Sequence, residues 1–197
     1  MTLRLPKREE RSERYDSNAE INRIISECFK KSIDNYTDDR AFVLADAKEI
    51  LRDSEYGEVP YGGKTLKEAG CAVFCFEQGV RSRGYQCKIE SLAKEISEKG
   101  YYYFGKGTYH NLFDHFGLRR ATDAQEINDA LNLRKVVTVL VNNCEYTGGK
   151  IEEGSHFINI VGKDYEGNFF VDDSSLKERQ NVDAETIFKS ARVVWIW

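Results

Sequence analysis

The chain has 197 residues, of which 41% are hydrophobic and 31% charged, and its 29 basic and 33 acidic side chains give a formal charge of −4. This length is typical of a globular protein with one principal domain and a core of its own. A slightly acidic chain without a basic stripe is poorly suited to track phosphates, so we expect no nucleic-acid partner.

Two features of the sequence predict a cytoplasmic protein. No stretch approaches the roughly 18 consecutive apolar residues of a membrane span, and residues 1–16 lack the apolar run of a secretory signal. The five cysteines are odd in number and lack C-x-x-C spacing, which favours a reducing compartment over disulfides. The three histidines form no cluster with a cysteine pair, so we expect no metal and no other cofactor.

The N-terminal quarter of the chain differs in character from the rest. Residues 1–17 are dense in charge and poor in apolar groups, which predicts a flexible arm. Apolar residues then recur at three- and four-residue steps, so residues 18–56 are predicted to form an accessory helical region. A loop with three glycines and a proline follows at 56–63 and ends that region. The remaining segment, 57–197, is predicted to be the catalytic domain.

Within residues 57–197, helical patterns come first and strand patterns follow. Residues 71–80 are small and apolar on all sides, which predicts a buried helix. Residues 91–99 predict a surface helix, and residues 109–116 and 123–131 predict two more short helices. Runs at 136–141, 157–161, 169–171 and 193–197 are rich in β-branched and aromatic residues, which predicts strands, and a short helix is predicted at 183–189. Helices followed by an antiparallel sheet define an α+β fold class.

Three residues have the types and order of a thiol catalytic site. Cys71 follows Gly70 at the start of the predicted buried helix, where N–H groups lower a thiol pKa and bind an oxyanion. His156 opens a predicted strand and is the candidate base, with Asp172 or Asp173 as the acid that orients it.

The predicted hairpin discriminates between the two acids. With a four-residue loop at 164–167, Lys163 lies directly opposite Asn168. Two residues, one from each strand, then point to the same face of the hairpin when their residue numbers add to an odd number. His156 then shares a face with Asp173, and not with Asp172. A loop of odd length or a bulge would reverse this preference.

Structural interpretations of the same residues stay open. Taken alone, Cys71 fits packing, His156 fits a core histidine, and the acids fit a polar turn that ends a strand. Cys75 is predicted to be a core residue, and His110 and His115 are reserve bases. Thr65 to Glu68 also fits a capping box, which would start the helix earlier and place Cys71 in its second turn.

Two segments resemble the papain-like cysteine peptidases of the double-glycine, bacteriocin-leader-processing family: YGGKTLKEAGCAVFCF and HFINIVGKDYEGNFFVDDSS. The resemblance implies a papain-like fold in which Cys71 is the nucleophile, His156 the base and acid, and Asp173 the orienting residue. It also implies a peptide or protein substrate. Thr65 stands six residues before the cysteine, where the family usually has a glutamine that completes the oxyanion hole.

The sequence therefore predicts an enzyme that cleaves a peptide or amide bond through a Cys-His-Asp triad. A transglutaminase or deamidase would use the same three residues, because only the acceptor of the acyl group differs. A papain-like module that binds peptides or a protein partner without turnover is the alternative from another class.

Overall fold

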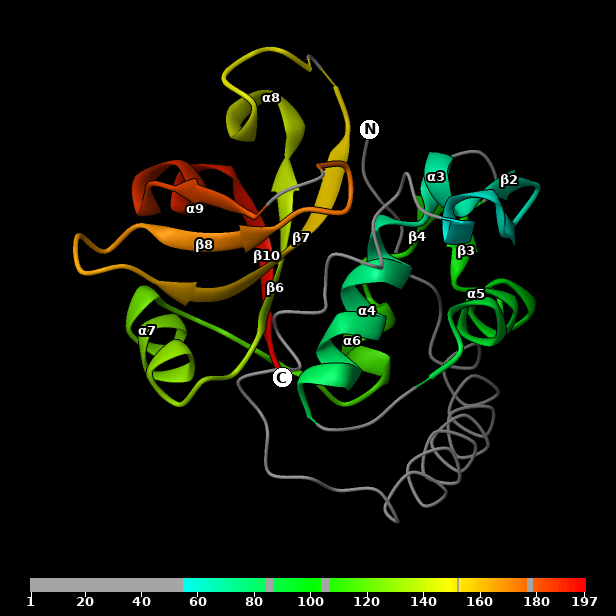
Figure 1. Cartoon of the computed structure of the whole chain (residues 1–197), viewed down its shortest axis with the longest axis horizontal. Coiled ribbons are helices and arrows are strands. Elements are labelled where there is room, and N and C mark those ends of the chain that lie inside the picture. Colours follow the sequence, from blue (N-terminus) through cyan, green and yellow to red (C-terminus); the bar gives the residue numbers. More distant parts are fainter. Residues whose placement is uncertain (1–54, 84–86, 104–106, 152, 177–178) are drawn as a thin grey trace, which may run out of the picture. The chain divides into compact units, whose positions relative to one another are not determined.

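The computed structural model describes residues 55–83, 87–103, 107–151, 153–176 and 179–197, which belong to one compact unit (Figure 1). The predicted charged arm, 1–17, lies outside the described residues, as does the predicted accessory helical region except for its last two residues. Those two begin a short 3-10 helix, η3 (Glu55–Glu58).

The strands of the described residues form one large antiparallel sheet and two small ones. The order in the large sheet is β5-β10-β6-β7-β8-β9. Its strands are, in that order, Arg119–Arg120, Ala191–Ile196, Val137–Asn142, Ser155–Lys163, Phe169–Asp172 and Gln180–Val182. The two small sheets pair β1 (Pro60–Tyr61) with β2 (Lys64–Thr65), and β3 (Tyr102–Tyr103) with β4 (Gly107–Thr108).

The helices confirm the predicted α+β class, with ends that differ by a few residues from those expected. They are α3 (Leu66–Ala69), α4 (Cys71–Ser82), α5 (Ile89–Glu98), α6 (Leu112–His115), α7 (Ala124–Asn132), α8 (Asn143–Tyr146) and α9 (Ala184–Ser190). In the part of the chain that the structure describes, we find no helix with the length and apolarity of a membrane span.

The large sheet has a different core on each face, because successive side chains of a strand point to opposite sides. One face packs against α7 and α9 through buried aliphatic residues. This cluster includes Ile127, Val137, Val139, Val141, Ile158, Ile160, Val171 and Ile187. The other face contacts α4, which lies along β7 (Figure 1). That contact joins the helix that begins at Cys71 to the strand that carries His156.

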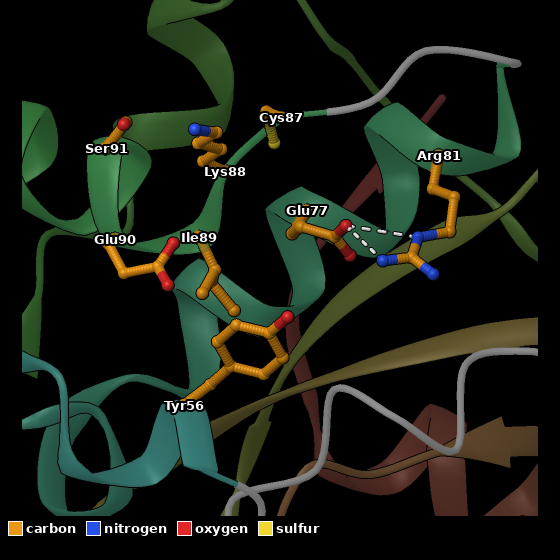
Figure 2. Close-up of a pocket in the computed structure, with 8 residues that line it drawn as sticks. All are labelled: Tyr56, Glu77, Arg81, Cys87, Lys88, Ile89, Glu90 and Ser91. Carbon is orange, nitrogen blue, oxygen red and sulfur yellow. Dashed lines mark hydrogen bonds and ion pairs between the residues drawn. The ribbon is translucent and has the colours of Figure 1, made fainter.

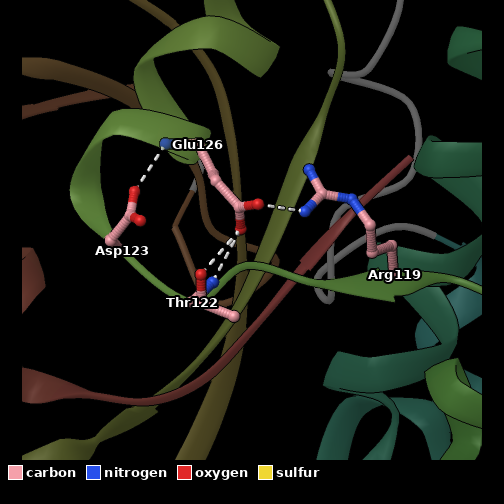
Figure 3. A network of polar contacts seen from close by, with 4 residues as sticks. All are labelled: Arg119, Thr122, Asp123 and Glu126. Carbon is pink, nitrogen blue, oxygen red and sulfur yellow. Dashed lines mark hydrogen bonds and ion pairs between the residues drawn. The ribbon is translucent and has the colours of Figure 1, made fainter.

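A polar network fixes the start of α7, as the pattern at 123–131 predicts. The Asp123 side chain accepts a hydrogen bond of 2.9 Å from the Glu126 N–H, which is the usual role of an N-cap residue. The Glu126 carboxylate in turn accepts from the Thr122 N–H at 2.8 Å and from the Arg119 guanidinium (Figure 3). The bond to Asp123 occupies the Glu126 N–H, one of the donors that the first helical turn leaves without a helical partner.

The β7–β8 hairpin differs from the prediction in two places. Its loop has five residues and not four, because Lys163 pairs with Phe169. A bulge between Ile160 and Gly162 then shifts the register by one residue, so that Asn159 pairs with Asp172. The predicted loop length is therefore wrong. The two one-residue shifts cancel, and beyond the bulge paired residue numbers again have an odd sum.

Candidate active site

Cys71 is the first residue of α4 because Gly70 separates that helix from α3. The predicted capping box is present, with the Thr65 N–H donating to the Glu68 carboxylate at 2.9 Å, but it starts α3, which ends at Ala69. The capping box therefore does not place Cys71 in a second helical turn. A Cβ atom at Gly70 would lie 2.5 Å from the carbonyl oxygen of Leu66, so this close junction between the helices requires glycine.

The half-buried Cys71 thiol has partners that favour its ionised form. Burial raises its pKa, but a hydrogen bond to the His156 side chain and the charge of that ring lower it. Backbone hydrogen bonds from Phe157 and Ala72 also lower it, and together these contacts bring the pKa below the usual value for a thiol. The site is therefore electrostatically suited to a thiolate.

The His156 ring connects Cys71 to Asp173. Its Nε2 lies 2.7 Å from Oδ1 of Asp173, which leaves Nδ1 as the ring nitrogen available to the Cys71 sulfur. Burial lowers the pKa of His156, but the hydrogen bonds and charges of Asp173 and Cys71 outweigh it and raise the pKa to about 10. The same contacts lower the pKa of Cys71 and raise that of His156, so they favour an imidazolium–thiolate pair.

Asp173 is held by Ser175 and by Tyr146. Its Oδ1 also accepts hydrogen bonds from the Ser175 N–H at 2.8 Å and from the Ser175 hydroxyl at 2.6 Å. The Tyr146 hydroxyl of α8 is a further partner. Burial raises the pKa of Asp173, but the bonds from His156 and Ser175 lower it overall. The aspartate–serine turn follows a familiar local pattern, whereas nothing in the sequence near Tyr146 indicates its contact.

Asp172, the alternative acid, has a different set of partners. Its carboxylate accepts from Gln78 at 2.5 Å and from two nitrogens of Arg179 at 2.6 and 2.9 Å. Of the two reserve bases, His115 packs against the ring of Tyr101 with a centroid distance of 4.6 Å. His110 precedes α6 and lies near Asp114 of that helix.

Two residues between α5 and α6 lie close to the start of α4. A Cβ atom at Gly107 would be 3.6 Å from the carbonyl oxygen of Ala69. Next to it, the Thr108 hydroxyl lies 2.6 Å from the hydroxyl of the buried Tyr61. Burial raises the pKa of Tyr61, and the charge of Cys71 adds to this, so the pair belongs to the surroundings of the thiol.

A separate pocket of about 460 Å³ lies against the other side of α4 (Figure 2). Glu77 and Arg81 of α4 form an ion pair of 2.7 Å on its wall, and burial raises the pKa of Glu77 despite that pairing. The other lining residues are Tyr56, Cys87, Lys88, Ile89, Glu90 and Ser91. Since its lining includes neither Cys71 nor His156, the pocket is distinct from the candidate active site.

Neither a metal site in the described residues nor a match to a known protein adds evidence on what the candidate site does. Across the described ranges, we find no group of three or more His, Cys, Asp or Glu side chains placed to hold a metal ion. No protein-family model matches the chain, and no curated protein matches it significantly. The candidate site therefore depends on its own geometry.

Proposed function

We propose that the protein is a cysteine peptidase-like enzyme that cleaves a peptide or amide bond. The observation that supports this most directly is the continuous chain of hydrogen bonds from Cys71 through His156 to Asp173. A nucleophile, a base and an orienting acid in that order are the requirements for covalent catalysis by a thiol.

In the proposed reaction the Cys71 thiolate attacks the carbonyl carbon, and the carbonyl π electrons move to the oxygen. The Cys71 N–H at the start of α4 donates to the oxyanion. As the carbon–nitrogen bond breaks, His156 gives its Nδ1 proton to the leaving amine, and an acyl thioester remains on Cys71. His156 then takes a proton from water as the oxygen of that water attacks the thioester carbon. The carbon–sulfur bond breaks, the carboxylic acid leaves, and the Cys71 thiolate and the His156 imidazolium are restored.

Asp173 keeps the imidazole in position through both halves of this reaction. Its negative charge stabilises the imidazolium, and its bond to Nε2 directs Nδ1 toward the sulfur. An amine that replaces water in the second half would give transglutaminase activity, and a glutamine side chain as the amide would give deamidation.

One observation favours the alternative of a peptide-binding module. The Thr65 hydroxyl, at the position of the family's oxyanion-hole glutamine, donates to Glu68 at 3.3 Å and is occupied in the capping box. A site with one fewer oxyanion donor would lose about 3 kcal/mol of transition-state stabilisation, or roughly a hundredfold in rate.

The proposal is tested by thiol reactivity and by turnover. The alkylation rate of Cys71 by iodoacetamide, followed by peptide mass spectrometry, should stay high down to pH 6 in the wild type. In His156→Gln it should fall at least about tenfold at pH 6. The full chain should also produce new termini in a library of proteome-derived peptides, and Cys71→Ala should not.

Each outcome has a separate meaning. Reactivity at Cys71 that equals that of Cys144 at pH 6 would overturn the activated thiolate. Fast alkylation without cleavage, combined with peptide binding that survives Cys71→Ala, would replace the enzyme with the binding module.

A further inference from the structure

A chain of hydrogen bonds between buried side chains crosses from the sheet to α4. The Trp197 indole donates to the Thr138 hydroxyl at 2.8 Å, and that hydroxyl donates to Oδ1 of Asn159 at 2.6 Å. The Asn159 amide then donates to Oε1 of Gln78 at 2.6 Å, and the Gln78 amide donates to Asp172 at 2.5 Å.

The same amide of Asn159 binds the backbone of α4. Its Nδ2 donates to the carbonyl oxygen of Cys75 at 3.0 Å, in addition to its bond with Gln78. Thr138 and Asn159 have no exposed surface, so every amide hydrogen that lacked a partner there would carry a large desolvation cost. The bonds therefore define one preferred position of α4 on β7.

This position determines where Cys71 lies. The backbone of Phe157 contacts the Cys71 sulfur, and Asn159 contacts the Cys75 carbonyl. Four helical residues rise about 6 Å, and two strand residues span about 6.6 Å. The two contacts are therefore spaced equally along α4 and along β7. If α4 moved along β7 at Asn159, the Cys71 sulfur would move away from His156 by the same distance.

We propose that Gln78 and Asn159 are positioning residues that hold the Cys71 helix against the His156 strand. This inference rests on the proposed function, because it assigns the network a role in maintaining the reactive pair. An apolar contact would hold the helix with less directional preference, since dispersion forces depend weakly on sliding, whereas hydrogen bonds weaken steeply with misalignment.

The test uses Gln78→Leu, which removes both side-chain bonds of Gln78 while its neighbours keep others. Asn159 retains Thr138 and the Cys75 carbonyl, and Asp172 retains Arg179. We expect the iodoacetamide alkylation rate of Cys71 at pH 6 to fall about tenfold, which corresponds to a rise of one pKa unit. At pH 10, where the thiolate forms in both proteins, the rates should converge.

A double substitution provides the rescue. Gln78→Glu alone places two carboxylates together and should also lower the rate at pH 6. When Gln78→Glu is combined with Asp172→Asn, the residue at 172 donates and the residue at 78 accepts, which reverses the bond between these two positions. Residue 78 still offers Asn159 an acceptor, so the alkylation rate of Cys71 at pH 6 should be restored. These two variants also test the proposal if Gln78→Leu does not fold.

A matched control separates positioning from loss of stability. Asp123→Ala removes the N-cap of α7, a change that lowers stability away from the site, and should leave the alkylation profile of Cys71 unchanged. A folded Gln78→Leu variant with the wild-type profile, or an equal change in Asp123→Ala, would overturn the inference.

Failure of the proposed function has a different signature, namely a wild-type Cys71 that ionises like an ordinary thiol. The inference is then decided by the ring pKa of His156, measured by NMR titration. Gln78→Leu should lower that pKa because the ring loses its hydrogen bond to the Cys71 side chain, and an unchanged pKa would contradict a positioning role.

Discussion

Cys71 and Cys75 lie one turn apart on α4, but their surroundings shift the two thiol pKa values in opposite directions. Burial raises the pKa of Cys75 well above its usual value, and the charges of Cys71 and Asp173 add to the increase. At Cys71 the same desolvation is outweighed by His156. One helix thus carries one thiol suited to attack and one suited to packing.

The orienting role proposed for Asp173 predicts the effect of Asp173→Asn. The imidazolium loses its anionic partner, so we expect the pKa of His156 to fall below about 10 and that of Cys71 to rise. Alkylation of Cys71 by iodoacetamide at pH 6 should slow about tenfold or more. NMR titration of the His156 ring and the alkylation rate measure the two changes.

Asp129→Asn, on the exposed surface of α7, is the control for that substitution and should alter neither quantity. A His156 pKa that stayed the same in Asp173→Asn would show that the carboxylate does not stabilise the imidazolium.

The three candidate catalytic residues could be selected from the sequence because each has a local signature. Cys71 follows a glycine at a helix start, His156 lies at the start of an apolar strand, and Asp173 directly follows its hairpin partner. The contact of Tyr146 with Asp173 has no such signature, because it depends on how α8 packs after the sheet has formed. Their catalytic roles remain a proposal.

Among the elements, the junction between α3 and α4 has the most direct effect on the thiol. The glycine at position 70 allows the end of one helix to meet the start of the next without a side chain between them. The first-turn N–H groups of α4 are consequently free of a preceding helical turn and available to the sulfur and to a bound oxyanion.

Gly70→Ala tests this junction. The added methyl group would lie 2.5 Å from the carbonyl oxygen and 2.7 Å from Cδ2 of Leu66, so the helices must move apart. We expect a loss of about 1–3 kcal/mol in the free energy of unfolding, measured by urea denaturation. Cys71 alkylation at pH 6 should slow as well.

Gly162→Ala is the comparison for that substitution, because its methyl group would meet only Cδ2 of Phe170 at 3.3 Å. It should cost less stability and leave Cys71 reactivity unchanged. Equal effects of the two substitutions would contradict a special role for the junction.

Element types were more predictable than element details. Among the described residues, the predicted helices and strands with clear periodicity are present, whereas the two-residue strands β1 to β5 are too short for any hydrophobic period. The hairpin register agreed with the prediction beyond Gly162 only because an extra loop residue and a bulge offset each other. A bulge depends on tertiary packing, so alternation alone does not locate it.

For the molecule as a whole, the Cys71–His156 pair links stability to pH. Unfolded His and Cys have pKa values near 6.5 and 8.5. Between these values the native pair and the unfolded chain each hold about one proton, so the contribution of the pair is constant. Above pH 8.5 the native pair keeps a proton that the unfolded chain has lost, so stability falls as pH rises toward about 10. Below pH 6.5 the unfolded chain binds the extra proton, and stability falls as pH decreases.

A double-mutant cycle of Cys71→Ala and His156→Gln measures this contribution. We expect a coupling free energy of about 1.5–3 kcal/mol between pH 6.5 and 8.5, typical of a hydrogen bond between charged groups. It should decline on both sides of that range. A coupling that rose steadily from pH 6 to 10 would contradict the imidazolium–thiolate pair.

The tip of the β7–β8 hairpin is a practical site for engineering, because the bulge beside Gly162 separates this tip from the candidate triad. Hydrogen bonds within the tip hold it, including those that Asp164 accepts from the N–H groups of Glu166 and Asn168. Tyr165 at the tip is fully exposed. An affinity tag or a fluorescent label inserted there should report on this protein in cells while the Cys71–His156–Asp173 site keeps its geometry.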